Sequence, residues 1–167
     1  MRSRFTASAM NSLLIFEGVA ASPSSDLHDT GLIMVIPPAS VRILTGVFMG
    51  PVSVDVESLE TRPAEDDIRW EDVAEFTARR TPGVPVSVHG EMELPSEGVP
   101  DLDPSDSELV RIRVSATGRD ANFDLAVSEP TEQYLVQVWP SDQDESVTWR
   151  SSSRTATSRR TAKPVAG

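Results

Sequence analysis

The side chains with the clearest capacity for recognition form one acidic run, which comprises Glu65, Asp66, Asp67, Glu71 and Asp72. Closely spaced carboxylates attract basic proteins and can occupy the phosphate-binding site of a nuclease. The whole chain is acidic as well, with a formal net charge of −11 over 167 residues. We therefore expect these five residues to bind a basic partner protein. The alternative is an acidic surface that only confers solubility.

The residues that usually perform catalysis are scarce in this chain. His28 and His89 are the only imidazoles, neither has metal-ligand or triad spacing, and there is no cysteine. The sequence lacks the nucleophile elbow, the H-E-x-x-H helix, the P-loop and the dinucleotide fingerprint. A pair of carboxylates alone can hydrolyse a glycoside, but among 26 acidic residues no pair stands out. We expect no enzyme, no catalytic residue and no cofactor.

Two further polar stretches could bind ligands. Residues 101–108 alternate carboxylates as a calcium loop does, but they lack its glycine and its final glutamate, so we expect a solvated loop and no metal site. Gly118, Arg119 and Asp120 could place an arginine–carboxylate fork at the rim of a sheet. This fork is either a recognition site or a loop staple in which Arg119 is held by Asp120 or Asp124. We favour the staple.

The stretch that must position this fork is 108–140, which contains two alternating segments joined by a polar loop. Apolar and polar side chains alternate through 110–117, and the alternation returns at 134–139. A period of two residues is typical of a half-buried strand. We therefore expect two paired strands with the Gly-Arg-Asp loop between them.

Shorter segments of the same kind lie at 12–17, 31–36, 41–48, 52–56, 73–79 and 84–88. We expect the segments at 41–48 and 52–56 to form a hairpin. Residues 64–80 fit either a helix or a turn near Trp70 followed by a strand, and we favour the turn and strand. The chain as a whole predicts an all-β fold, an antiparallel β-sandwich of about seven to nine short strands.

The charge of the chain divides it into a body and a tail. Residues 150–167 hold five basic side chains and no acidic one, which leaves 10 basic and all 26 acidic side chains before them. We expect a β-sandwich domain at 12–140, an N-terminal extension at 1–11, and a polar, basic, disordered tail at 141–167. The tail has too few apolar residues to offset the entropy of ordering. Nucleic acid binding is disfavoured for the body and stays open only for 150–163.

The sequence favours a cytoplasmic protein without a membrane partner. No apolar run approaches the roughly 18 residues that a spanning helix needs. The first 21 residues resemble a signal peptide only in outline, because Ser8, Asn11 and Ser12 interrupt the apolar region and Glu17 closes it.

Three stretches carry a family resemblance: VRILTGVFMGPVSV at 41–54, RIRVSATGRD at 111–120 and EPTEQYLVQVWP at 129–140. They resemble small uncharacterised β-rich proteins of actinobacteria. More distantly, the order of elements resembles the competence-nuclease inhibitor family of Gram-positive bacteria. The resemblance implies a β-rich fold and marks six motif residues without giving them a role: Gly118, Arg119, Asp120, Glu132, Tyr134 and Trp139.

These features favour a non-enzymatic interaction protein whose acidic surface binds a basic partner. The most specific version of this hypothesis is an immunity protein or a nuclease inhibitor. The alternative is a small-ligand or carbohydrate-binding β-sandwich that uses Trp70, Trp139 or Arg119.

Overall fold

The fold is almost entirely β-structure. The computed structural model describes residues 1–22, 26–64, 69–93, 101–103, 105 and 107–162. Its strands are β1 (Arg2–Ala9), β2 (Leu13–Ala21), β3 (Ile33–Ile36), β4 (Ser40–Leu44), β5 (Gly50–Ser58), β6 (Asp72–Arg80), β7 (Ser87–Gly90), β8 (Leu109–Thr117), β9 (Gln133–Ser141) and β10 (Thr148–Ser151). A 3₁₀ turn, η1 (Leu27–Thr30), precedes β3, and one helix, α1 (Arg154–Thr161), follows β10. The expected all-β class is confirmed.

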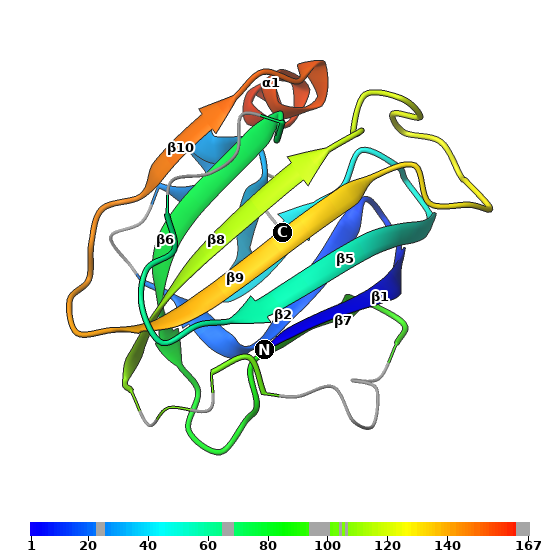
Figure 1. The fold of residues 1–167 in the computed structure, drawn as a ribbon. Coiled ribbons are helices and arrows are strands. Elements are labelled where there is room, and N and C mark those ends of the chain that lie inside the picture. The colour runs from blue at the N-terminus through cyan, green and yellow to red at the C-terminus, as the bar shows by residue number, and fades with distance from the viewer. Residues whose placement is uncertain (23–25, 65–68, 94–100, 104, 106, 163–167) are drawn as a thin grey trace.

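The strands form one continuous mixed sheet in the order β1-β5-β9-β8-β6-β2-β4-β3, with β10 paired to β6 and β7 to β2 (Figure 1). The pair β5–β9 is parallel, and the other strand pairs are antiparallel. The expectation of a purely antiparallel fold is therefore wrong at this pair. Because β5 and β9 are far apart in sequence, their relative direction is not set by a short turn.

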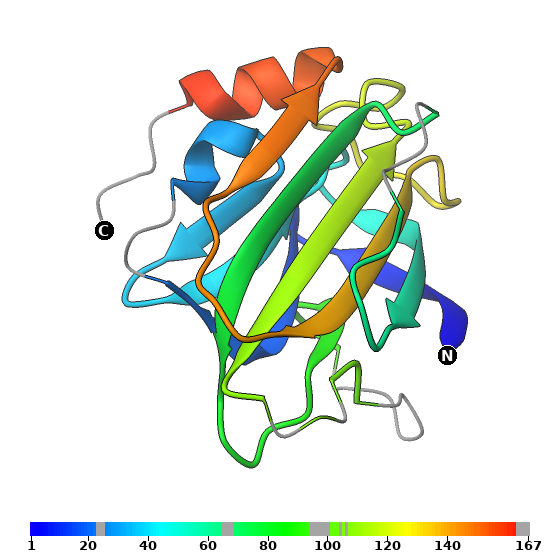
Figure 2. The ribbon, with the colours of Figure 1, turned by 60° about the vertical axis from the view of Figure 1, so that its left-hand side comes forward.

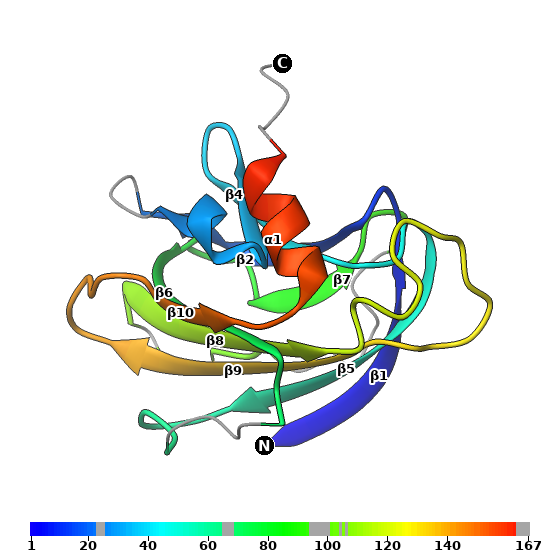
Figure 3. The ribbon, with the colours of Figure 1, turned by 90° about the horizontal axis from the view of Figure 1, so that it is seen from above.

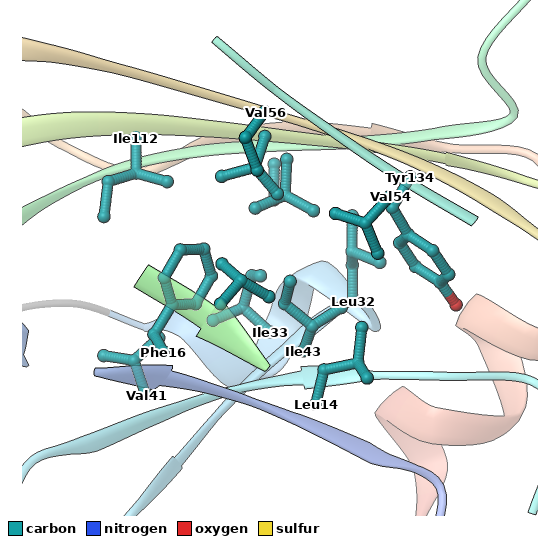
Figure 4. Packing of buried hydrophobic residues seen from close by; sticks show 14 of the residues in the cluster. Leu14, Phe16, Leu32, Ile33, Val41, Ile43, Val54, Val56, Ile112 and Tyr134 are labelled. Carbon is teal, nitrogen blue, oxygen red and sulfur yellow. The ribbon is translucent and has the colours of Figure 1, made fainter. Parts of the chain in front are cut away.

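The sheet bends so that β2 and β4 lie over β8 and β9, and the core fills the space between them (Figure 3). From one side Leu14, Phe16 and Ile43 enter the core, and from the other side Ile112 and Tyr134 meet them (Figure 4). Phe16 and Phe76 pack edge to face with ring centroids 6.3 Å apart. Alternating apolar residues on both halves of the sheet thus supply the core.

The two central strands behave as the alternation predicts. β8 and β9 pair antiparallel along their length, and Val110, Ile112 and Val114 face the core. The opposite face of β8 differs from the expectation of a half-exposed strand, because Arg111 and Arg113 are buried too. The guanidinium of Arg113 donates to the carbonyl of Ala64 at 2.7 Å, and Arg111 donates to the carbonyl of Ser146 at 2.8 Å. Neighbouring chain segments therefore cover this face.

The expected hairpin of 41–48 with 52–56 is wrong. β4 pairs with β2 and β3, whereas β5 pairs with β1 and β9. Between them Thr45 and Val47 are buried, and the chain crosses from one layer of the bent sheet to the other. A buried crossing of this kind stands in place of the tight turn that the expected hairpin needs.

The N-terminal residues also belong to the sheet. We expected an extension at 1–11, but β1 occupies Arg2–Ala9 and pairs with β5. Phe5, Ala7 and Ala9 alternate with exposed polar residues, and the small size of the two alanines weakens the strand pattern in the sequence. The structure describes no helix long and apolar enough to cross a membrane.

The C-terminal segment is ordered, so the expected disorder is wrong for the strand and helix within it. β10 pairs with β6 and leads into α1 (Figure 2). Ser153 caps the start of α1, and its hydroxyl accepts from the amide of Ala156. Only Thr155 and Ala156 of α1 are buried. The helix is held mainly by polar contacts rather than by an apolar face, which explains why composition did not reveal it. The part of the expected tail at 163–167 lies outside the described residues.

Candidate functional site

The three motif stretches meet at one end of the sheet. Glu132, at the start of β9, is buried and accepts from the backbone amides of Gly46 at 3.0 Å and Val47 at 2.6 Å. The hydroxyl of Tyr134 donates to the same carboxylate at 2.5 Å. Glu132 therefore ties the connection between β4 and β5 to the start of β9, across more than 80 residues of sequence.

Tyr134 serves as a neutral donor in this arrangement. Its ring lies in the core (Figure 4). Burial is the main cause that raises the pKa of the hydroxyl well above its usual value, and the adjacent Glu132 carboxylate raises it further. A phenol that keeps its proton can donate to a buried carboxylate over the physiological pH range. The pair is thus a fixed hydrogen bond rather than an acid–base couple.

Arg119 forms the second part of the cluster. Its guanidinium is fully buried, donates to Asp72 Oδ2 at 2.9 Å and donates to the carbonyl of Gly31 at 2.7 Å. A carboxylate therefore holds Arg119, as the staple requires. The expected partner is wrong, because Asp72, and not Asp120 or Asp124, pairs with Arg119. A buried ion pair needs such additional hydrogen bonds to offset the desolvation of both charges.

Two glycines allow these segments to approach. A Cβ on Gly46 would lie 2.1 Å from the carbonyl oxygen of Arg119, and a Cβ on Gly118 would lie 2.4 Å from that of Thr131. Gly118 also has a φ of +84°, a region that favours glycine. The L-T-G and G-R-D stretches therefore need glycine for close backbone packing.

The helix α1 caps the cluster. Asp120 accepts from the amides of Arg154 at 3.0 Å and Thr155 at 2.7 Å, and from the Thr155 hydroxyl at 2.7 Å. Burial opposes ionisation of Asp120, but these hydrogen bonds outweigh it and lower the pKa of the carboxyl. Arg159 donates to the carbonyl of Thr45 at 2.8 Å and lies 4.9 Å from the ring centre of Phe123. The C-terminal segment thus packs over the motif residues.

Above the cluster, two loops expose large apolar side chains. We call the surface formed by Phe48, Met49, Phe123 and Leu125 the loop platform; their exposed fractions are 40%, 40%, 39% and 55%. The connection between β8 and β9, at the upper right of Figure 1, supplies Phe123 and Leu125. Monomeric proteins seldom gather exposed apolar side chains, and such patches mark interaction sites.

Backbone hydrogen bonds join the two loops of the platform. The amide of Phe48 donates to the carbonyl of Leu125 at 2.9 Å, the amide of Val127 donates to that of Met49 at 2.9 Å, and the amide of Asp124 donates to that of Gly46 at 2.8 Å. Asp124 has a φ of +61°, which is uncommon for a residue with a side chain. These bonds and the buried cluster beneath them fix the positions of the exposed side chains.

Two members of the acidic run, Glu71 and Asp72, are engaged in contacts within the fold. Asp72 is buried in its pair with Arg119, so its assignment to partner binding is wrong. Glu71 is partly buried and accepts from the Thr117 hydroxyl and the Gly118 amide, both at 2.8 Å. The other three members, Glu65, Asp66 and Asp67, lie outside the described residues.

Trp139 is the motif residue that lies away from the cluster. It is buried on the outer face of the sheet, where Arg62 and Arg113 lie 5.5 Å and 5.7 Å from its ring centre. The same two arginines and Arg111 converge on the buried carboxylate of Glu75. Neither Trp139 nor Arg119 is accessible as a ligand platform, which removes two of the three residues considered for small-ligand binding.

The structure offers no grouping typical of metal or nucleophilic chemistry within the ranges that it describes. His89 lies 3.1 Å from a carboxylate oxygen of Glu17 and 2.7 Å from the carbonyl of Gly90. No three histidine or carboxylate side chains of the described residues lie together as metal ligands.

Sequence analysis did not identify the loop platform. The signal was present as Phe123 and Leu125 within an otherwise polar loop. Comparison with known proteins adds no assignment, since no family model, curated protein or solved structure matches the chain.

Proposed function

We propose that the protein is a non-enzymatic interaction module that binds a basic partner protein through the loop platform. The observation that carries this proposal is the platform itself, since its four apolar side chains are exposed although the backbone beneath them is hydrogen-bonded. Burial of such side chains against a partner is favourable by about 25 cal/mol for each Å² of apolar surface removed from water. We also propose that the fold is a β-sandwich, because the two halves of the bent sheet face each other across the core.

The buried cluster supports this proposal through preorganisation. Glu132 and Arg119 anchor the two loops from below, and Arg159 contacts Phe123 from the side. A surface that is already ordered loses less conformational entropy on binding than a mobile loop does. The motif residues therefore act as positioning residues for the platform rather than as contact residues.

Charge indicates the chemistry of the partner. The net charge of −11 gives the protein a negative field that attracts basic surfaces over distances set by ionic strength. Asp124 and Glu129 are exposed on the loop that carries Phe123 and Leu125. The most specific function that we propose is that of an immunity protein or nuclease inhibitor, because a nuclease presents a basic phosphate-binding surface.

Photocrosslinking in the native cell lysate tests this proposal. A photoreactive residue at Leu125 should crosslink to one basic protein, and the yield should fall as salt is raised. The same residue at Trp149 serves as the control, because Trp149 is 45% exposed on β10, which lies on the opposite side of Figure 1 from the β8–β9 connection. Crosslinking of the same protein from both positions, or a yield independent of salt, would contradict the proposal.

A matched pair of serine variants tests the platform directly. Phe123→Ser with Leu125→Ser should abolish binding of the crosslinked protein, whereas Trp149→Ser should leave it unchanged. Because the substituted side chains are exposed, both variants should unfold at nearly the wild-type denaturant concentration. Equal binding by the two variants would refute the role of the platform.

A further inference from the structure

A cavity of about 260 Å³ lies on the outer face of the sheet, away from the loop platform. Its lining comes from β1, β5, the ends of β8 and β9, and the chain before β6. It comprises Arg2, Arg4, Asp55, Arg69, Trp70, Thr117 and Gln133. Among the described residues, this lining holds three guanidinium groups and one carboxylate; Arg2 also pairs with Glu57 beside the cavity, and Arg69 is engaged in an interaction of its own, so Arg4 is the guanidinium group that remains for a ligand. This composition points to an anionic ligand.

Internal pairing leaves hydrogen-bond donors in this cavity. Arg4 donates to Asp55 through Nε at 2.6 Å and Nη2 at 3.0 Å, which leaves its Nη1 without an acceptor among the described residues. Arg2 donates to the same carboxylate at 3.0 Å. Asp55 therefore serves two guanidinium groups, and Arg2 also lies 3.6 Å from a carboxylate oxygen of Glu57. The Arg4 side chain is 66% exposed, so its remaining donors are accessible to a ligand.

Neutral donors join the arginines. The indole N–H of Trp70 and the side-chain amide of Gln133 have no acceptor among the residues that the structure describes. The hydroxyl of Thr117 already donates to Glu71 at 2.8 Å. An amide donor, an indole donor and a guanidinium donor around one cavity match the acceptor-only oxygens of a carboxylate or phosphate.

The cavity is held in place by contacts outside it. The carbonyl of Trp70 accepts from Arg150 at 2.6 Å, and Glu71 accepts from both Thr117 and Gly118. These bonds position the indole ring beside the arginines. The tryptophan can then supply an apolar surface against which a planar ligand lies.

We propose that this cavity binds a small molecule that bears an oxyanion, a carboxylate or a phosphate, next to a planar apolar group. Arg4 and Gln133 hydrogen-bond the oxyanion, and Trp70 contacts the planar group. The volume is below the range of roughly 300–1,000 Å³ that is common for drug-sized ligands, so the ligand is small. This site is separate from the loop platform and does not depend on the proposed function.

Titration of the full-length chain with phenyl phosphate, benzoate and benzyl alcohol tests the inference. Tryptophan fluorescence and calorimetry should show saturable binding of one or both anions and none of the neutral alcohol. Preference between phenyl phosphate and benzoate then identifies the oxyanion. Absence of saturable binding by both anions, or equal binding of the alcohol, would overturn the inference.

Two pairs of variants locate the site. Arg4→Gln should weaken anion binding at least about tenfold, the loss of one charge-assisted hydrogen bond, whereas Arg79→Gln, an exposed arginine paired with Glu108, should not. Trp70→Phe should remove the fluorescence response, and Trp149→Phe should retain it. Equal effects within either pair would place the ligand elsewhere and refute the proposal.

Discussion

Replacing Glu132 by glutamine changes one buried side chain on which both loops depend. The carboxylate accepts from Gly46, Val47 and Tyr134, and it has no exposed surface through which water could substitute. In Glu132→Gln one oxygen becomes an NH₂ group, which cannot accept. At least one buried donor then loses its acceptor, and the remaining hydrogen bonds lose the assistance of the negative charge.

The expected loss in the free energy of unfolding is about 3 kcal/mol. Hydrogen bonds to charged groups contribute about 1.5–3 kcal/mol each, and a buried donor left unpaired costs about 1–3 kcal/mol. For a chain of this size the melting temperature should fall by roughly 6–12 °C, at about 2–4 °C for each kcal/mol. A smaller loss, about 1.5 kcal/mol, is expected for Tyr134→Phe, which removes only one of the donors.

Chemical and thermal unfolding, followed by circular dichroism and tryptophan fluorescence, measure this loss. Glu129→Gln is the matched control, because Glu129 lies on the same loop and is exposed. It should change stability by less than about 0.5 kcal/mol. If Glu132→Gln and Glu129→Gln unfold at the same denaturant concentration, Glu132 does not brace the loops.

Three further variants test other parts of the account. Arg119→Met should destabilise the fold by about 3–5 kcal/mol in denaturant unfolding, because it leaves Asp72 as an unpaired buried charge; a near-neutral effect would contradict the ion pair. Gly46→Ala should lower the free energy of unfolding more than Gly83→Ala, for which a loss of about 1 kcal/mol is expected. The reason is that a Cβ at Gly46 would meet backbone atoms, whereas one at Gly83 would meet open space. The reverse order would contradict the close packing. Burial alone would raise the pKa of Glu75, but its hydrogen bonds to neighbouring arginines lower that pKa below the ordinary 4.5. The stabilisation that this carboxylate gives to the fold is therefore complete above pH 4.5 and is lost as the pH falls through the pKa of the folded state. Unfolding free energies measured between pH 7 and pH 3 should therefore decline less steeply in Glu75→Gln, and parallel curves would argue against a role for this carboxylate.

Strands with a strict period of two were predictable from sequence. Val110, Ile112 and Val114 face the core as expected, because alternation is a local property of the strand. The crossing between β4 and β5 was not predictable in the same way, and the sequence indicated a hairpin there instead. Whether Thr45 and Val47 turn at the surface or cross the core depends on Glu132, a residue far along the chain.

Polar segments carried even less local information. The α1 helix has no apolar stripe, and its position depends on Asp120 and on Arg159, whose contacts lie 34 or more residues away. Composition alone therefore predicts disorder there. Arg119 illustrates the same limit, because the sequence offers Asp120 and Asp124 as nearby partners whereas folding brings Asp72 to it.

Amide hydrogen exchange tests the central claim most directly, namely that the buried cluster holds the loop platform rigid. Ile112→Ala is the control, since loss of this core side chain should lower global stability by about 2–5 kcal/mol without touching the loops. In Glu132→Gln the amides of Phe48, Asp124 and Val127 should exchange at least about tenfold faster than in Ile112→Ala, because local opening governs their exchange. Equal exchange of these amides in the two variants would contradict the account.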